Sequence, residues 1–350
     1  MFGRLSLSIV MVWGLACGAA RAQSPGDFYR GKTVSIIVGF GAGGGYDLYA
    51  RLLARHFGEF IPGNPTVMVQ NMPGAGSLRA AQYIQSVAPR DGTVTGALDR
   101  QAPVAAVLGG NPAIKYRARD MVFLGTLSSY ADDAFVLWAR RDAGAKSLAD
   151  LMRPDGPELK VGGSASGSTD DATVILLRDL TGMRLKLITG YPDGNSIALA
   201  LERGELEGRT SGVSSISATH PDWMRPDGHV QAIVQVGRKT RLPVIAHVPT
   251  ARELARDDRG RAIIETMETP YQFARPFVLP PGLPADRQGA LRKAFMAASN
   301  SPGLRAEAAK MSVDISPLDG ETVGRLVVGM ESAPPEVLAY LRKLLSPEQP

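Results

Sequence analysis

Two loops rich in glycine and serine are the segments whose residue types could do chemistry. The first is "GFGAGG", Gly39 to Gly44, which spells G-x-G-x-x-G between a β-branched run and an amphipathic helical pattern. Glycines permit positive φ and let a ligand approach the main chain closely. The unpaired amides at the start of the next helix lie at the positive end of its dipole. The pattern therefore predicts an anion site at a helix N-terminus, although tight packing of strand on helix would also explain the glycines.

The same loop lacks the partners that a nucleotide would need. A dinucleotide fingerprint requires an acidic residue about 20 residues further on, at the end of the second strand. That strand ends in Gln70 and Asn71, and Glu59, which has the right spacing, falls in the preceding helical pattern. A phosphate-binding P-loop would require Lys followed by Ser or Thr after the glycines, and neither follows. We therefore expect no nucleotide and no other cofactor.

The second loop is "GGSASGSTDD", Gly162 to Asp171, and it also lies between a predicted strand and a predicted helix. It offers backbone amides and four hydroxyl groups. Ser168 or Thr169 suits the N-cap, with Asp170 and Asp171 in the first turn, so ordinary capping explains part of this pattern. Two such loops that faced each other could hold a ligand with two carboxylates, or with one carboxylate and one polar end.

Catalytic chemistry has weaker support. A loop serine could act as the nucleophile of a hydrolase, but the segment does not spell G-x-S-x-G. The four histidines have no ligand spacing, and the only cysteine is Cys17, so we expect no metal site. A hydrolase remains an alternative.

The elements that carry these loops alternate between strand and helix, and they do so twice. Strand patterns over 33–38, 64–71 and 93–98 have helical patterns between them, and the alternation restarts near Phe135. This predicts two α/β lobes with parallel strands and a cleft between them, where ligands bind beyond the carboxyl ends of the strands. The chain is expected to change lobe near 128–134 and near 236–242. Lobe one would comprise residues 23–130 and 240–350, and lobe two residues 131–239.

The N-terminus has the layout of a secretory signal. Arg4 precedes an apolar run that is too short to span a bilayer, and Ala20-Arg21-Ala22 is typical of a cleavage site. Residues 1–22 are therefore predicted to be a signal peptide, and the protein to be exported. Lipidation of Cys17 stays open, although Gly14 stands where lipoprotein signals prefer Leu. The 39 basic and 34 acidic residues are scattered, which argues against a nucleic-acid partner.

Several segments together resemble the substrate-binding proteins of tripartite tricarboxylate transporters, the Bug-type family. They include "VGFGAGGGYDLYARLLARHFGEFIPGNP", "VQNMPGAGSLRAAQYI", "LKVGGSASGSTDD" and "RPFVLPPGLPADR", and the resemblance covers nearly all of the chain after residue 22. It implies a two-lobe periplasmic binding protein of type II, a "Venus flytrap", which closes around a small organic carboxylate without catalysis. The implied partners are that organic acid and the permease subunits in the membrane, and we expect a monomer. Presentation of the ligand to a membrane receptor kinase is an alternative that the sequence leaves open.

The resemblance also implies which residues bind the ligand. The family's first carboxylate-binding loop falls on residues 40–44, with Asp47 and Asn71 beside it, and the second on residues 164–169. This sequence departs from the family at Asp170-Asp171 and at Tyr191-Pro192-Asp193-Gly194, where a cation is lost. Arg100 and Arg209 could restore the positive charge, unless they are surface arginines. The predicted ligand-binding residues are Phe40, Gly41, Ala42, Gly43, Gly44, Asp47, Asn71, Arg100, Ser164, Ser166, Gly167, Ser168, Thr169, Asp170, Tyr191, Gly194 and Arg209.

Overall fold

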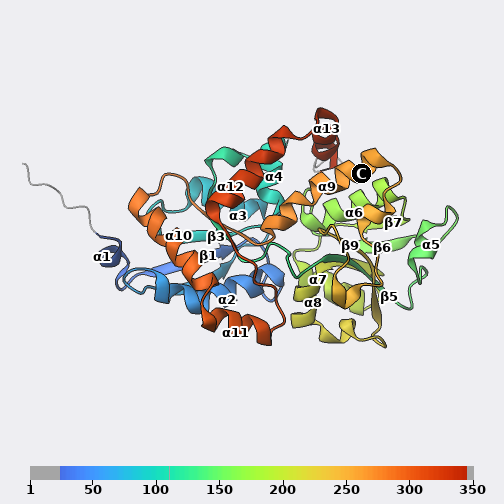
Figure 1. Ribbon diagram of the computed structural model, residues 1–350, viewed down its shortest axis with the longest axis horizontal. Coiled ribbons are helices and arrows are strands. Elements are labelled where there is room, and N and C mark those ends of the chain that lie inside the picture. The colour runs from blue at the N-terminus through green and yellow to red at the C-terminus, as the bar shows by residue number, and fades with distance from the viewer. Residues whose placement is uncertain (1–23, 110, 345–350) are drawn as a thin grey trace, which may run out of the picture.

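The computed structural model describes residues 24–109 and 111–344 (Figure 1). The predicted signal peptide, residues 1–22, lies outside the described residues. No helix in the described ranges is both long enough and apolar enough to cross a membrane.

The first sheet has six strands in the order β11-β4-β10-β3-β1-β2. Strand β1 pairs in parallel with β2 and with β3, as the alternating pattern predicts. Strand β10 lies antiparallel between β3 and β4, so a distant part of the chain completes this sheet. The strands are β1 (Thr33–Val38), β2 (Thr66–Asn71), β3 (Val94–Ala97), β4 (Val122–Thr126), β10 (Pro276–Leu279) and β11 (Leu318–Asp319).

The second sheet has five strands in the order β7-β6-β8-β5-β9. Strand β6 pairs in parallel with β7 and β8, whereas β5 is antiparallel to both of its neighbours. The strands are β5 (Phe135–Arg140), β6 (Leu159–Gly162), β7 (Leu185–Ile188), β8 (Gly208–Gly212) and β9 (Val230–Val236). The two sheets lie side by side along the long axis of the molecule (Figure 1).

Helices cover both sheets (Figure 1). With the first sheet lie α2 (Gly45–Phe60), α3 (Leu78–Gln82), α4 (Gln101–Leu108), α10 (Ala285–Ser299), α11 (Pro302–Lys310) and α12 (Gly320–Gly329), while α1 (Pro25–Tyr29) contacts α10. With the second sheet lie α5 (Leu148–Met152), α6 (Thr169–Thr181), α7 (Gly194–Glu202) and α8 (Val213–Thr219).

Two late helices associate with the second sheet's helices although they follow β9 in the chain. Helix α9 (Asp258–Met267) packs against α6, and the chain returns to the first sheet only afterwards, at β10. Helix α13 (Pro335–Leu344) contacts α4 beside the first sheet as well as α6 and α9. The lobe boundaries that we derived from the sequence remain a prediction, and this packing places residues 258–267 with the second sheet.

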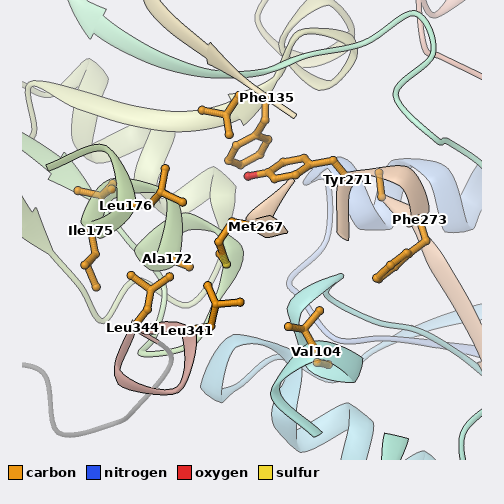
Figure 2. Packing of buried hydrophobic residues seen from close by; sticks show 14 of the residues in the cluster. Val104, Phe135, Ala172, Ile175, Leu176, Met267, Tyr271, Phe273, Leu341 and Leu344 are labelled. Atoms are coloured by element: carbon orange, nitrogen blue, oxygen red, sulfur yellow. The ribbon is translucent and has the colours of Figure 1, made fainter. Parts of the chain in front are cut away.

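The largest apolar cluster joins residues from both halves of the molecule. Tyr271 and Phe135 lie in it with ring centroids 5.4 Å apart. Figure 2 shows Leu341 of α13 beside Ala172 of α6, and both side chains are buried. Burial of one such leucine contributes about 1.5–3 kcal/mol, so the end of the chain stabilises the junction of the lobes.

Candidate ligand-binding site

Residues from both sheets and their helices enclose a small cavity at the carboxyl ends of β1, β3 and β8. Its volume is about 60 Å³, which corresponds to a few water positions. The lining residues are Phe40, Gly44, Gly45, Tyr46, Asp99, Arg100, Phe135, Thr169, Asp170, Gly194, Arg209, Thr210, Ser211, Gly212, Ser215 and Arg275.

Three helices begin at this cavity. Helix α2 starts at Gly45 after the N-cap Gly44, which has no side chain to accept from the first amides. Helix α6 places its first residue, Thr169, in the lining, and helix α7 does the same with Gly194. The positive ends of three helix dipoles are therefore directed at one small space, which favours a negatively charged group there.

Three arginines are buried around the same space: Arg100, Arg209 and Arg275 are 1%, 7% and 3% exposed. Each has a guanidinium nitrogen without a hydrogen-bond partner, namely Nη1 of Arg100 and Nε of the other two. Among the described residues, none of the three forms an ion pair with a carboxylate within 4.0 Å. A buried charge without a direct partner is costly, so an anion at this point would be strongly attracted.

Aromatic rings hold the guanidinium groups in place. Arg100 lies 4.5 Å from the ring centroid of Tyr271 and 5.0 Å from that of Tyr130, and its Nη2 donates to the Tyr130 hydroxyl at 3.2 Å. Arg275 lies 5.0 Å from the ring of Tyr46 and donates from Nη2 to Ser215 Oγ at 3.2 Å. Burial raises the pKa of Tyr46 to about 12, so this phenol stays neutral. The electron-rich face of its ring attracts the nearby guanidinium group.

Two carboxyl groups accompany the arginines. Asp99 Oδ1 accepts from Thr169 Oγ1 at 2.8 Å, and burial raises the pKa of Asp99. Asp170 Oδ1 accepts from Thr210 Oγ1 at 3.1 Å. Burial raises the pKa of Asp170 to about 6, and the nearby Arg209 opposes that rise. Three arginines against two acids leave the cavity positively charged even when both carboxyl groups are ionised.

The structure brings together part of the residue set that the sequence predicts. Phe40 and Gly44 of the first loop line the cavity, together with Thr169 and Asp170 of the second and Gly194 of the third helix start. Arg100 and Arg209 line it as well. Both arginines are buried, so the surface alternative for them is wrong.

Asp47 and Asn71 lie behind the first loop instead of in the lining. Asp47 Oδ2 accepts from the Gly43 amide at 2.8 Å, and Asn71 Nδ2 donates to the Phe40 carbonyl at 2.9 Å. Asn71 Nδ2 also donates to Asp47 Oδ1 at 2.9 Å. The two side chains hold the loop in shape, and the Gly43 amide is already used within it.

The remaining predicted residues also lie outside the lining. Gly41 and Ala42 face the second lobe, where Asn195 Nδ2 donates to the Ala42 carbonyl at 2.7 Å. Ser164 donates to Asp170 Oδ2 at 3.4 Å, and Ser168 caps α6. The others are Ser166, which is exposed, Gly167, which has a φ of 81°, and Tyr191, which packs against an apolar cluster of the second lobe.

Sequence reasoning missed several lining residues, above all Arg275, Asp99 and Tyr46. Asp99 could have been found, because it precedes Arg100 at the end of the same predicted strand. Arg275 directly precedes β10, and only the antiparallel insertion of that strand beside β3 brings it to the cavity. No local pattern signals such an insertion.

Two α/β lobes that contact each other around a positively charged cavity define a two-lobe solute-binding protein. The chain belongs to the family of tripartite tricarboxylate transporter receptors, whose model matches residues 50–331. It is 26% identical over 309 residues to a UPF0065 protein in the gbd 5' region of Cupriavidus necator, which covers 86% of this chain and 84% of that protein.

Solved structures show the same fold. The periplasmic binding protein BugD superposes with a TM-score of 0.71 at 18% identity, over 91% of this chain and all of that one. MatC from Rhodopseudomonas palustris, solved with bound malate, superposes with a TM-score of 0.65 at 21% identity, over 90% of this chain and 99% of that one.

Proposed function

We propose that this protein captures a small organic carboxylate in the periplasm and delivers it to the permease subunits of a tripartite transporter. The observation that carries the proposal is the convergence of three buried arginines, Arg100, Arg209 and Arg275, on one cavity between the lobes. A carboxylate there would accept charge-assisted hydrogen bonds from groups that otherwise stay partly unsatisfied. The relative MatC, which has malate bound, supports this class of ligand.

The ligand would be enclosed by movement of one lobe against the other. The chain passes between the sheets at residues 127–134, between β4 and β5, and returns before β10. Thr169 donates to Asp99 and Asn195 donates to Ala42, so hydrogen bonds already join the two lobes around the cavity. A hinge at the two connecting segments would open the cavity to solvent and close it over the ligand.

The hydrogen bonds of the loop serines support binding without catalysis. The hydroxyls of Ser164 and Ser168 donate to carboxylates of their own helix start, Asp170 and Asp171. A nucleophilic serine needs a general base that accepts its proton, such as a histidine within hydrogen-bond reach. The protein would act as a monomer, exported by the signal peptide that the sequence predicts.

A thermal-shift screen tests this function. Malate, succinate, benzoate and aspartate would each be added to the purified protein, with NAD⁺ as the comparison. We expect at least one acid to raise the melting temperature in proportion to the logarithm of its concentration, because binding to the folded state alone stabilises it. A rise with NAD⁺ and with none of the acids would refute the proposal.

A further inference from the structure

Three glycines of the first loop and helix start face the second lobe. A Cβ atom added to Gly41 would lie 1.9 Å from Asp193 Oδ2 and 2.8 Å from Asp193 Cγ. One added to Gly43 would lie 2.7 Å from Asn195 Nδ2, and one added to Gly45 would lie 2.5 Å from Ser215 Oγ. At these three alternating positions, a side chain could be accommodated only if the facing side chain of the opposite lobe shifted.

The neighbouring glycines have different surroundings. A Cβ atom added to Gly44, which lines the cavity, would have nothing within 4 Å. One added to Gly39 would lie 1.9 Å from Ser77 Oγ, within the same lobe. The glycines of this segment thus have three different surroundings. Gly39 packs inside lobe one, and Gly44 faces the ligand space. The other three, Gly41, Gly43 and Gly45, face lobe two.

The groups that these glycines meet are held in position. Asp193 is the N-cap of α7, and its Oδ1 accepts from the Ser196 amide at 2.9 Å and from Ser196 Oγ at 3.1 Å. Asn195 is held by its bond to the Ala42 carbonyl. Asp193 could move away from an added methyl group only by giving up the cap of its helix.

We propose that the glycine loop is the docking surface for the start of α7, and that Gly41 is needed for lobe closure and not for contact with the ligand. The inference goes beyond ligand capture, although it rests on the opening and closing of the lobes in the proposed function. Gly41 is the residue that isolates this role. Gly43 has a φ of 84°, where any side chain would strain the backbone whatever lay opposite.

Closure can be measured without a ligand by a disulfide between the lobes. A Cβ atom on Gly45 of lobe one would lie 3.3 Å from Cβ of Ser215 in lobe two, close to the separation of about 3.5–4.5 Å in a disulfide, and Gly45 begins a helix, where a side chain does not strain the backbone. The chain has only one cysteine, Cys17, so Gly45→Cys and Ser215→Cys would be introduced together with Cys17→Ser. The rate of cross-linking under a mild oxidant, read from non-reducing gels, then reports how often the lobes meet.

Adding Gly41→Ala to this pair should slow cross-linking by about tenfold or more, because the methyl group meets Asp193 before the lobes meet. Gly44→Ala is the matched control and should leave the rate within about twofold, since its φ of −77° suits alanine and its Cβ has open space. Adding Asp193→Gly to Gly41→Ala should restore the rate, because glycine is also tolerated at the N-cap.

Equal rates with and without Gly41→Ala would overturn the proposal, and so would slowing that Asp193→Gly does not relieve. Failure of the parent pair to cross-link would overturn it as well, because the lobes would then not meet as the structure has them. None of these outcomes depends on an organic acid. A failed thermal-shift screen with a slowed Gly41→Ala variant would reject the proposed ligand class and keep the docking surface.

Discussion

Thr169 Oγ1 donates to Asp99 Oδ1 at 2.8 Å, and this bond joins the start of α6 in one lobe to the end of β3 in the other. Both residues line the cavity, and both are buried. The carboxylate is held by a residue from across the cleft and lies next to Arg100 in the chain. The contact between the lobes therefore includes Asp99, an acidic group of the site, whose neighbour in the chain is the basic Arg100.

Replacement of Arg275 by glutamine should weaken ligand binding without destabilising the ligand-free protein. Loss of a charge-assisted hydrogen bond to the carboxylate should weaken binding by about 1.5–3 kcal/mol, roughly tenfold to a hundredfold, in calorimetry with the acid that binds wild type. The ligand-free protein should not lose stability, because a buried cation without an ion pair is removed.

Arg225→Gln is the control for that variant, because Arg225 is 69% exposed and its ion pair with Asp222 lies at the surface. It should bind the acid like wild type. Unchanged affinity in Arg275→Gln would mean that the ligand's carboxylate lies elsewhere in the cavity.

The Asp170→Asn variant should be more stable than wild type at neutral pH. Burial raises the folded-state pKa of Asp170 from 3.8 to about 6, so wild type ionises a buried group at a cost as the pH rises through that value. The advantage of asparagine should be on the order of 1–3 kcal/mol above about pH 7 and should disappear below about pH 4.

Urea unfolding of both proteins between about pH 4 and pH 8 measures this difference directly. Asp99 and Asp171 also have raised pKa values and raise that of Asp170, so the measured difference includes their response to the loss of its charge. A difference that did not vary with pH would show that Asp170 does not ionise in this range.

Asp47→Asn should weaken the first loop. Although burial opposes it, hydrogen bonds from Arg51, Gly43 and Asn71 lower the pKa of Asp47 below 3.8. The carboxylate therefore contributes stability that is present above its unfolded pKa and is lost as the pH falls through the folded one.

The expected cost of Asp47→Asn is about 1–3 kcal/mol of unfolding free energy at neutral pH, because the Gly43 amide and Arg51 lose a charged acceptor. The difference from wild type should shrink in acid. Equal stability at neutral pH would show that the loop keeps its shape without this carboxylate.

Leu341→Ala should destabilise the folded protein by about 2–5 kcal/mol, because Leu341 is fully buried in the cluster that α13 shares with α6 and α9. Chemical unfolding monitored by circular dichroism gives the value. Glu336→Ala, at an exposed position of the same helix, should change stability by less than about 0.5 kcal/mol. Similar losses in both variants would mean that α13 contributes through its helicity and not through this contact.

The predicted two-lobe α/β class is confirmed, and so is the family resemblance. Hydrophobic alternation in short segments suffices to predict the α/β class, because each βα unit buries its own apolar face, whereas the family resemblance rests on the quoted motifs. The sequence also predicts α2 and α6 behind their loops, since glycine and N-cap signals act within a few residues. The positions of β10, α9 and α13 depend on contacts with segments that are distant in the sequence, and local signals do not encode those contacts.

For the first loop as well, the sequence predicts one part of the chemistry and the tertiary structure decides the other. The letters G-F-G-A-G-G establish that the backbone can approach something closely at a helix N-terminus. Which glycine faces what depends on the opposite lobe: Asp193 stands against Gly41, while Gly44 faces the cavity. The charge of the site is likewise a tertiary property, because Arg100, Arg209 and Arg275 come from three distant segments. Only the fold brings them together, and it also supplies the aromatic rings that stabilise them, since Tyr271 lies against Arg100 and Tyr46 against Arg275.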